Sequence, residues 1–232
     1  MSVNAGPNAV EDGLVLALDA ANSRSYSGTG TTWSDLSGNG NTGTLTNGPT
    51  FDSANAGSIV FDGVNDYINY ASNLNVGNTF TVNCWMKPTT SGRQTIFSNK
   101  YPYQSNKGFF LCCPGNSSTS FFISLGQDQK IAMSSNGAIT SNIIQMITVT
   151  VNSNLELIKL YVNGLEISSY SLQTDADILV QYDSGVFVTG KRDTTSNDKL
   201  NSPIYNLQMY NRALTAAEVT QNFNATRSRY GI

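Results

Sequence analysis

Short stretches in which apolar and polar residues alternate are the feature of this sequence that most restricts its fold. In Phe80–Met86 the side chains of Phe80, Val82, Cys84 and Met86 fall on one face of an extended chain, which is typical of a half-buried strand. Similar runs are separated by clusters of Gly, Asn, Pro and Ser. The other expected strands include Leu14–Leu18, Ser58–Phe61, Tyr67–Tyr70, Phe109–Cys112, Phe121–Leu125, Ile143–Val151, Val186–Thr189 and Ile204–Tyr210. The pattern predicts an all-β fold of many short strands.

Composition supports the same prediction. Charged residues make up only 12% of the chain, well below the usual value of about 25%, so the polar surface is mostly Asn, Ser, Thr and Gly. These residues favour turns and are poor in helix interiors. All-β sandwiches often reach the present length of 232 residues as one domain. We predict one sandwich domain over residues 13–232, preceded by an N-terminal arm over residues 1–12 that has few apolar residues.

The clearest hairpin lies between Leu155–Val162 and Leu165–Tyr170. Its two-residue connection, Asn163-Gly164, tolerates the positive φ angles of a type I′ turn. In a regular hairpin with this turn, Leu160 lies opposite Ile167. The turn therefore predicts both the position and the register of this strand pair.

One helix is expected near the C-terminus. Thr215 and Glu218 have the spacing of a capping box, and Leu214 with Val219 fits a hydrophobic staple. Beyond the helix, Arg229 suits the negative end of the helix dipole. The expected fold is therefore a β-sandwich with one short C-terminal helix.

Charge and hydropathy exclude several classes of partner. The net charge is −3, the pI is about 4.8, and no Lys/Arg cluster is present, which disfavours nucleic acid as a partner. No stretch approaches the roughly 20 apolar residues of a membrane span, so no membrane partner is expected. The N-terminus also lacks the basic and apolar regions of a signal peptide. The three cysteines, Cys84, Cys112 and Cys113, are expected to be buried free thiols.

Five segments in sequence order resemble the laminin-G-like jelly rolls of the concanavalin A-like lectin/glucanase superfamily. They are Trp33–Asn41, Phe61–Tyr67, Phe80–Lys87, Leu160–Gly164 and Tyr210–Thr215. The resemblance covers roughly residues 12 to 225. It implies a two-sheet antiparallel jelly-roll β-sandwich with binding loops along its rim. The chain departs from the family at Ile143–Met146, where aromatic and His residues are common, and at Tyr205-Asn206, where an acidic pair is common.

The two ends of the chain resemble, more narrowly, members of this family found in tailed-bacteriophage virion proteins. The segments concerned are Asn4–Pro7 leading into Gly13–Asn22, and Gln221–Thr226 before Arg229–Gly231. This resemblance implies a capsid-decorating or tail/fibre-associated protein on the virion surface, made in the host cytoplasm without a signal peptide. Its implied partners are other virion proteins, such as capsid or tail proteins, and host-surface glycans. Homo-oligomerisation stays open.

Catalysis is disfavoured by the residues available. The chain has no histidine, which excludes triads with a His base and His-based metal sites. Retaining glycosidases need two carboxyl groups about 5–5.5 Å apart. The four glutamates, Glu11, Glu156, Glu166 and Glu218, show no such pattern: Glu218 fits a helix cap, and Glu156 and Glu166 fit solvent-facing hairpin positions. We therefore expect a protein that is not an enzyme.

No cofactor is required by the sequence, and calcium is the one metal ion considered. Oxygen ligands are available in Asp62, Asn65 and Asp66, which suit a hard cation. The same residues also suit a turn in which their side chains bond the local backbone. The turn is the favoured interpretation, and calcium stays as its alternative.

Sugar binding typically needs aromatic side chains that stack on pyranose rings, together with planar polar groups. The best candidate cluster is Tyr101, Tyr103 and Gln104, with rim contacts from Asp183, Arg192 and Asp193. The tyrosines equally suit a sheet edge or a subunit contact, and Trp33 and Trp85 suit the core.

The sequence is compatible with two functions and disfavours a third. The first is a virion surface protein with weak carbohydrate binding, and the second is a soluble lectin or adhesin whose main role is glycan recognition. A glycoside hydrolase, the third, is disfavoured by the carboxylates. The sequence does not separate the first two.

Overall fold

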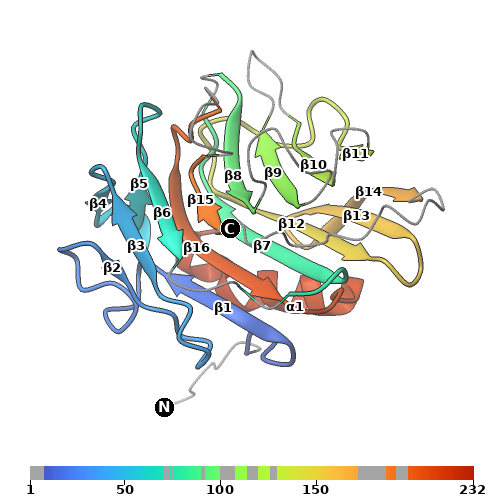
Figure 1. Ribbon diagram of the computed structural model, residues 1–232, viewed down its shortest axis with the longest axis horizontal. Coiled ribbons are helices and arrows are strands. Elements are labelled where there is room, and N and C mark those ends of the chain that lie inside the picture. Colours follow the sequence, from blue (N-terminus) through green and yellow to red (C-terminus); the bar gives the residue numbers. More distant parts are fainter. Residues whose placement is uncertain are drawn as a thin grey trace.

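The computed structural model describes residues 8–70, 74, 76–89, 92–99, 108–113, 120–125, 130–171, 187–191 and 198–232. These residues form two antiparallel sheets packed face to face, with one α-helix near the C-terminus (Figure 1). The predicted fold class is confirmed. The strands are β1 (Leu14–Asp19), β2 (Thr32–Trp33), β3 (Gly43–Thr46), β4 (Thr50–Asp52), β5 (Ser58–Val60), β6 (Tyr67–Tyr70), β7 (Phe80–Met86), β8 (Gln94–Ser98), β9 (Phe109–Cys113), β10 (Phe122–Leu125), β11 (Lys130–Met133), β12 (Gln145–Asn152), β13 (Leu157–Val162), β14 (Leu165–Ser171), β15 (Val188–Thr189) and β16 (Pro203–Tyr210). The helices are α1 (Ala216–Thr226) and the 3-10 turns η1 (Ala54–Ala56) and η3 (Arg227–Tyr230).

Both sheets bring together strands that are distant in the sequence. Sheet A has the order β14-β13-β12-β7-β16-β5-β4, and β1 also pairs with β16. Sheet B has the order β11-β10-β9-β8-β15-β6-β3-β2. In sheet A, Asn83 and Gln208 are register partners 125 positions apart, and their side chains form a hydrogen bond of 2.7 Å. The central strands therefore depend on pairings that no local signal specifies.

Aromatic side chains from both sheets meet in the main core. Phe80 of β7 stacks on Phe109 of β9, with ring centroids 4.4 Å apart. Phe97 of β8 lies 5.6 Å from Phe187 and 5.9 Å from Phe109. Trp33 is also fully buried in this core. The contact between Phe80 and Phe109 joins the two sheets directly.

The cysteines are free and buried, as predicted. Cys84 and Cys113 belong to the main core, whereas Cys112 lies with Phe110 and Phe122 in a separate apolar cluster. Burial raises the pKa of all three thiols, to about 12 for Cys112. Since the thiolate is the reactive form, none of them is suited to act as a nucleophile.

The C-terminal helix covers the outer face of sheet A. Trp85, on that face, stacks on Phe223 of α1 with ring centroids 5.6 Å apart and contacts Tyr230 of η3 at 4.5 Å. Tyr161 and Tyr205 belong to the same apolar cluster. Among the helices of the described ranges, none is long and apolar enough to cross a membrane.

The start of α1 has the predicted capping box. The hydroxyl of Thr215 accepts a hydrogen bond from Glu218 N, and the Glu218 carboxylate accepts one from Thr215 N at 2.8 Å. Two nitrogens of Arg212 donate to the same carboxylate at 2.6 and 3.0 Å, and these bonds lower the pKa of Glu218 to about 2. Arg229 was expected to support the end of the helix, but its guanidinium binds Asp19 at 2.7 Å. The reason is that η3 extends the chain past α1 to the end of β1.

The Asn163-Gly164 hairpin forms with both turn residues at positive φ, 50° and 79°. The register predicted beyond the turn is wrong from Leu160 onward: Leu160 lies opposite Ser168, and Ile167 is an extra residue in a bulge. A bulge places two residues of one strand opposite one of the other. The two-residue turn fixes the first pair, but it does not exclude a bulge further along.

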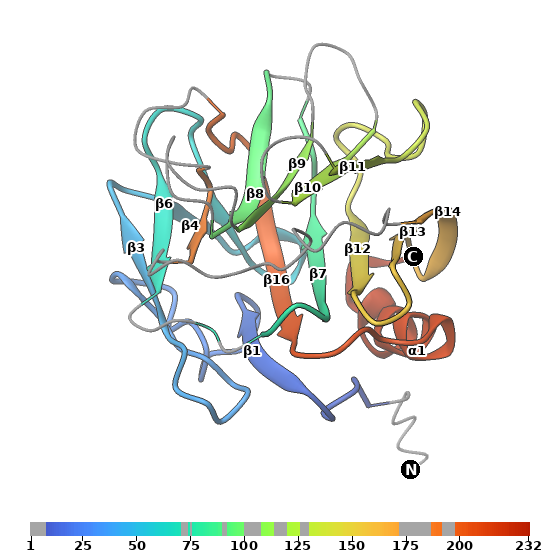
Figure 2. The ribbon, with the colours of Figure 1, turned by 45° about the vertical axis from the view of Figure 1, so that its right-hand side comes forward.

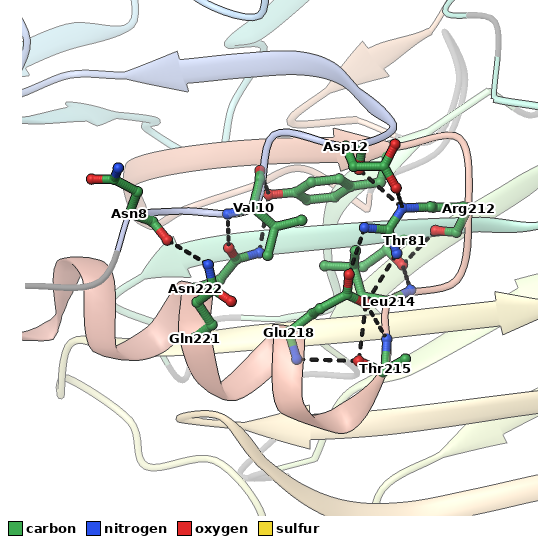
Figure 3. Close-up of polar contacts among 11 residues, drawn as sticks. Asn8, Val10, Asp12, Thr81, Arg212, Leu214, Thr215, Glu218, Gln221 and Asn222 are labelled. Carbon is green, nitrogen blue, oxygen red and sulfur yellow. Dashed lines mark hydrogen bonds and ion pairs between the residues drawn. The ribbon is translucent and has the colours of Figure 1, made fainter.

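The N-terminal segment from Asn8 to Asp12 packs on α1 and β16 (Figure 3). Val10 N donates to Asn222 Oδ1 at 2.8 Å, and the Tyr210 hydroxyl donates to Val10 O at 3.0 Å. Val10 is only 7% exposed and belongs to the cluster beneath the helix. The expectation that residues 1–12 add little to the core therefore does not hold at Val10. Residues 1–7 lie outside the described residues, and an arm there stays a prediction.

Candidate functional site

The C-terminal helical segment covers one outer face of the sandwich and not the other. The face of sheet A is sealed by α1 and η3 through the apolar cluster around Trp85. In the described part of the chain, no helix covers the outer face of sheet B, which lies on the other side of the molecule from α1 (Figure 2). We call this surface the helix-free face. It is the candidate binding site because the other large face is already occupied by the chain itself.

An arginine lies between two aromatic rings on the helix-free face. The guanidinium carbon of Arg93 is 5.3 Å from the Phe110 ring centroid and 5.2 Å from that of Phe122. The rings come from the neighbouring strands β9 and β10 and are packed edge to face. Arg93 Nε is also 3.4 Å from an Asp198 carboxylate oxygen. We call these four residues the arginine–phenylalanine cluster.

In this cluster the charged group is exposed and the aromatic rings are buried. Phe110 and Phe122 are buried, whereas the Arg93 side chain is 39% exposed. Contact with two aromatic faces orients a guanidinium through cation–π attraction. A ligand on this surface therefore meets oriented N–H donors beside a carboxylate, which is the arrangement that binds hydroxyl or carboxylate oxygens.

The rest of the helix-free face is more polar. Thr44, Asn69 and Val188 lie side by side across β3, β6 and β15, and the first two are exposed. Beside them, the ammonium group of Lys191 lies over the Tyr67 ring, 3.1 Å from its centroid. This surface offers hydroxyl, amide and ammonium groups to a ligand.

The residues predicted to bind carbohydrate all lie outside the described residues. They are Tyr101, Tyr103, Gln104, Asp183, Arg192 and Asp193. The sequence places them in connections to or from β8, β9 and β15, which are adjacent strands of sheet B. Their role in binding therefore stays a prediction that concerns this same sheet.

Sequence reasoning missed the arginine–phenylalanine cluster. A signal was present: Phe109–Cys113 contains five apolar residues in succession, and all five are buried. An uninterrupted apolar run indicates a strand covered on both faces. The residues that cover the outer side of β9 cannot be found from this run, because they depend on the pairing of β9 with β10 and on the position of Arg93.

The loop proposed for calcium forms a compact turn. Asp62 Oδ1 accepts hydrogen bonds from Val64 N at 2.8 Å and Asn65 N at 3.4 Å. Asp66 Oδ2 accepts one from Asp62 N at 3.0 Å, which closes the loop. Asn47 Nδ2 donates to Asn65 O at 2.9 Å. The favoured interpretation, a turn held by its own side chains, is confirmed for Asp62.

The polar motif Trp33–Asn41 has a structural role in this chain. The carboxylate of Asp35 accepts hydrogen bonds from the backbone of Ala17, Ser37 and Asn41, and from the Ser37 hydroxyl. Asn41 Nδ2 in turn donates to the backbone of β1. Because these bonds tie the loop to β1, Asp35 is already engaged within the fold.

The described glutamates do not form a catalytic pair. Glu218 binds Arg212, and Glu166 binds Lys159 at 2.8 Å on the exposed side of the hairpin. Glu156 lies in a turn at a φ of 51°. Within the described ranges there is also no group of three or more His, Cys, Asp or Glu side chains that could hold a metal ion.

Two antiparallel sheets, one sealed and one helix-free, define a lectin-like sandwich of the kind found in carbohydrate-binding domains. The profile of the Concanavalin A-like lectin/glucanases superfamily matches residues 62–220 of the 232 in the chain. The chain belongs to this superfamily. No curated protein sequence is significantly similar to it.

Several solved structures share the fold. The binding domain of Paraclostridial Mosquitocidal Protein 1 superposes with a TM-score of 0.70 and 23% identity, over 93% of this chain and 52% of that one. For the binding domain of botulinum neurotoxin serotype D the values are 0.68 and 17%, over 92% and 52%. This chain thus spans about half the length of those toxin domains. Domain 4 of AbnA, an extracellular arabinanase from Geobacillus stearothermophilus, solved in complex with arabinotriose, gives 0.66 and 20%, over 91% and 98%.

Proposed function

We propose that the chain is a non-catalytic carbohydrate-binding domain and that its ligand lies on the helix-free face. The observation that carries this proposal is the unequal cover of the two sheets: α1 seals the face of sheet A. The face of sheet B keeps an oriented guanidinium beside a carboxylate. The residues Tyr101, Tyr103 and Gln104 are proposed to add stacking and amide contacts from the connection between β8 and β9.

The relatives support a binding role over a catalytic one. Two are named as toxin binding domains, and a third is an arabinanase domain crystallised with arabinotriose. The arabinanase domain matches this chain over almost its whole length. A domain of this fold that was solved with an oligosaccharide supports a sugar-binding role for the present sandwich.

The test is a glycan array followed by isothermal titration calorimetry, with arabinotriose as the first probe. Arg93→Ala is expected to weaken binding about tenfold or more, because hydrogen bonds to charged groups contribute about 1.5–3 kcal/mol. Arg24→Ala is the matched control, since Arg24 is exposed and lies between β1 and β2. If no array glycan binds, or if the two variants bind equally well, the proposal is wrong.

A virion role is the second candidate, favoured by the position of the chain ends. The two ends of the chain, which carry the segments that resemble phage virion proteins, meet in the structure: Gln221 Nε2 donates to Asn8 O at 2.8 Å, next to the Val10–Asn222 contact (Figure 3). We propose that this junction faces a neighbouring capsid or tail protein, which leaves the helix-free face for host glycans. A soluble lectin or adhesin would use the same face without the junction.

Mass spectrometry of purified virions separates these two roles. A virion protein should be present at a fixed ratio to the major capsid or tail protein and should persist through density-gradient purification. Absence from particles, together with retained glycan binding, would instead support the lectin or adhesin.

A further inference from the structure

Residues 8–12, which we call the docked segment, lie against α1 and the end of β16 and belong to neither sheet (Figure 3). The side chain of Val10, at the centre of this segment, is buried in the apolar cluster beneath the helix. Its amide donates to Asn222 Oδ1 at 2.8 Å, and its carbonyl accepts from the Tyr210 hydroxyl at 3.0 Å. Asn222 Nδ2 also donates to the Tyr210 hydroxyl at 3.0 Å. The two side chains therefore hold each other in the arrangement that binds the backbone of Val10.

The ends of the docked segment are bound through their backbone as well. Gln221 Nε2 donates to Asn8 O at 2.8 Å, and Arg212 Nε donates to Asp12 O at 3.0 Å. The Asp12 carboxylate lies 2.8 Å from the same Arg212 nitrogen. The contacts fall on every second residue, as expected for a peptide that turns alternate residues toward one surface. All of these contacts can form equally well when the segment and the surface belong to different chains.

A tight turn joins the docked segment to β1. Leu14 N donates to Glu11 O at 3.0 Å, and Gly13, inside this turn, has a φ of 76°. The carbonyl of Gly13 accepts a hydrogen bond from Asn211 N at 2.9 Å, which fixes the start of β1 to the end of β16. Rotation about the φ angle of Gly13 would therefore move the docked segment and leave β1 in place. Gly13 is thus a hinge between a fixed sandwich and a removable segment.

We propose that two copies of this chain exchange their docked segments, so that residues 8–12 of each copy occupy the surface of α1 and β16 on the other. The exchanged form keeps every contact of the segment and changes only the turn at Gly13, which is why such exchange leads easily to dimers. The partner is a second copy because the peptide that fits this surface is the chain's own. Because both copies use the same surface, reciprocal exchange gives a closed dimer. The proposal depends neither on glycan binding nor on a virion role.

The closed monomer is favoured in dilute solution. A segment tethered beside its own binding surface has an effective concentration of about millimolar, so exchange requires either copies that are held close together or a turn that cannot close. Proline at residue 13 would prevent closure, because it fixes φ near about −65° whereas the closed turn needs 76°. The hinge therefore offers a way to shift the equilibrium without altering any contact of the docked segment.

The first test compares the oligomeric state of full-chain variants by analytical ultracentrifugation. The dimer of Gly13→Pro should have a dissociation constant about a hundredfold or more below that of the wild type, since the closed turn is disfavoured about tenfold or more in each chain. Gly38→Pro is the matched control, because Gly38 has a similar φ of 87° in the loop between β2 and β3, and it should associate no more than the wild type. Adding Val10→Asp to Gly13→Pro should restore the monomer, because it places a charge in the apolar cluster.

The second test identifies the surface that the exchanged segment occupies. Asn8→Cys and Gln221→Cys chains, both carrying Gly13→Pro, are co-expressed and treated with a short bis-maleimide reagent. The native thiols are buried, so the introduced thiols react, and exchange should give a covalent heterodimer of the two chains. In the control, Gln221→Cys is replaced by Thr29→Cys, at an exposed position between β1 and β2, and no such product is expected.

The outcomes that overturn the proposal are separate from a failure to fold. A folded Gly13→Pro variant that stays monomeric overturns it, as does a dimer that survives Val10→Asp or yields no cross-link between residues 8 and 221. Should Gly13→Pro not fold, the same pair of cysteine variants with Gly13 retained is cross-linked at about millimolar chain concentration, where exchange competes with closure. Absence of the heterodimer under those conditions also overturns the proposal.

Discussion

The most specific stability prediction concerns Gly164, because a side chain at this position would destabilise the fold in two separate ways. Gly164 has a φ of 79°, and a β-carbon there would lie 3.0 Å from Phe223 Cβ and 3.2 Å from Thr220 Cα. Both of those atoms belong to α1, and the Thr220 hydroxyl donates to Gly164 O at 2.9 Å. The hairpin turn therefore packs directly on the helix, and any side chain at Gly164 must displace it.

The expected loss of folding free energy in Gly164→Ala is the sum of a backbone cost and a packing cost. A left-handed conformation costs a non-glycine residue about 1–2 kcal/mol. Overpacking against atoms that cannot rotate away adds about 1–3 kcal/mol. The control is Gly38→Ala, since Gly38 has a similar φ of 87° but nothing within 4 Å of its β-carbon position.

The difference between these two variants isolates the contact with the helix. We expect Gly164→Ala to be less stable than Gly38→Ala by about 2 kcal/mol, or roughly 4–8 °C in Tm for a chain of this size. Equilibrium urea denaturation gives the free energies of unfolding, and calorimetry gives the Tm values. Equal losses in the two variants would show that packing of the turn on α1 contributes nothing, and would refute the reasoning.

Three further predictions concern other parts of the chain. The pKa of Glu218 is lowered to about 2, chiefly by hydrogen bonds from the Arg212 guanidinium. The stability that Glu218 contributes is therefore present above its unfolded pKa of about 4.3 and is lost as the pH falls toward 2. The free energy of unfolding of Glu218→Gln should accordingly fall less steeply with decreasing pH than that of the wild type. Val10→Ala removes two buried methyl groups and should cost about 1–2 kcal/mol in urea denaturation, whereas Val64→Ala, at a side chain 69% exposed, should change stability by less than about 0.5 kcal/mol. The wild type should release no reducing sugar from laminarin, agarose or carrageenan; release that disappears in Glu156→Gln or Glu166→Gln would show that the chain is an enzyme.

Local features of the structure follow closely from the sequence where one short segment contains all of the interacting groups. The capping box of Thr215 and Glu218 is such a case, since both partners lie within one turn of the same helix. The positive φ values of Asn163 and Gly164 are another. The alternation in Phe80–Met86 likewise predicts the bounds of β7, because side chains on a strand point to the two faces in turn. The expected half-buried strand is wrong, however, because all seven residues are buried, with Trp85 covered by α1 and η3.

Predictions from the sequence fail where a residue contacts a partner that is distant along the chain. The bulge at Ile167 depends on how β14 fits against β13. Arg229 binds Asp19, 210 positions away, in place of the helix end. Val10 is buried only because Tyr210 and Asn222 lie beside it in the folded chain. No sequence window contains these pairs.

The same limit applies to the candidate sites. The amino-acid sequence by itself determined the fold class, the free thiols, the expected lack of a catalytic carboxylate pair, and the oxygen-rich loop at Asp62–Asp66. Tertiary structure decided which outer face α1 covers and that Arg93 lies between Phe110 and Phe122. The physical reason is that strand composition and turn chemistry act between near neighbours, whereas burial and pairing across a sandwich depend on strands that the chain brings together only when the two sheets close.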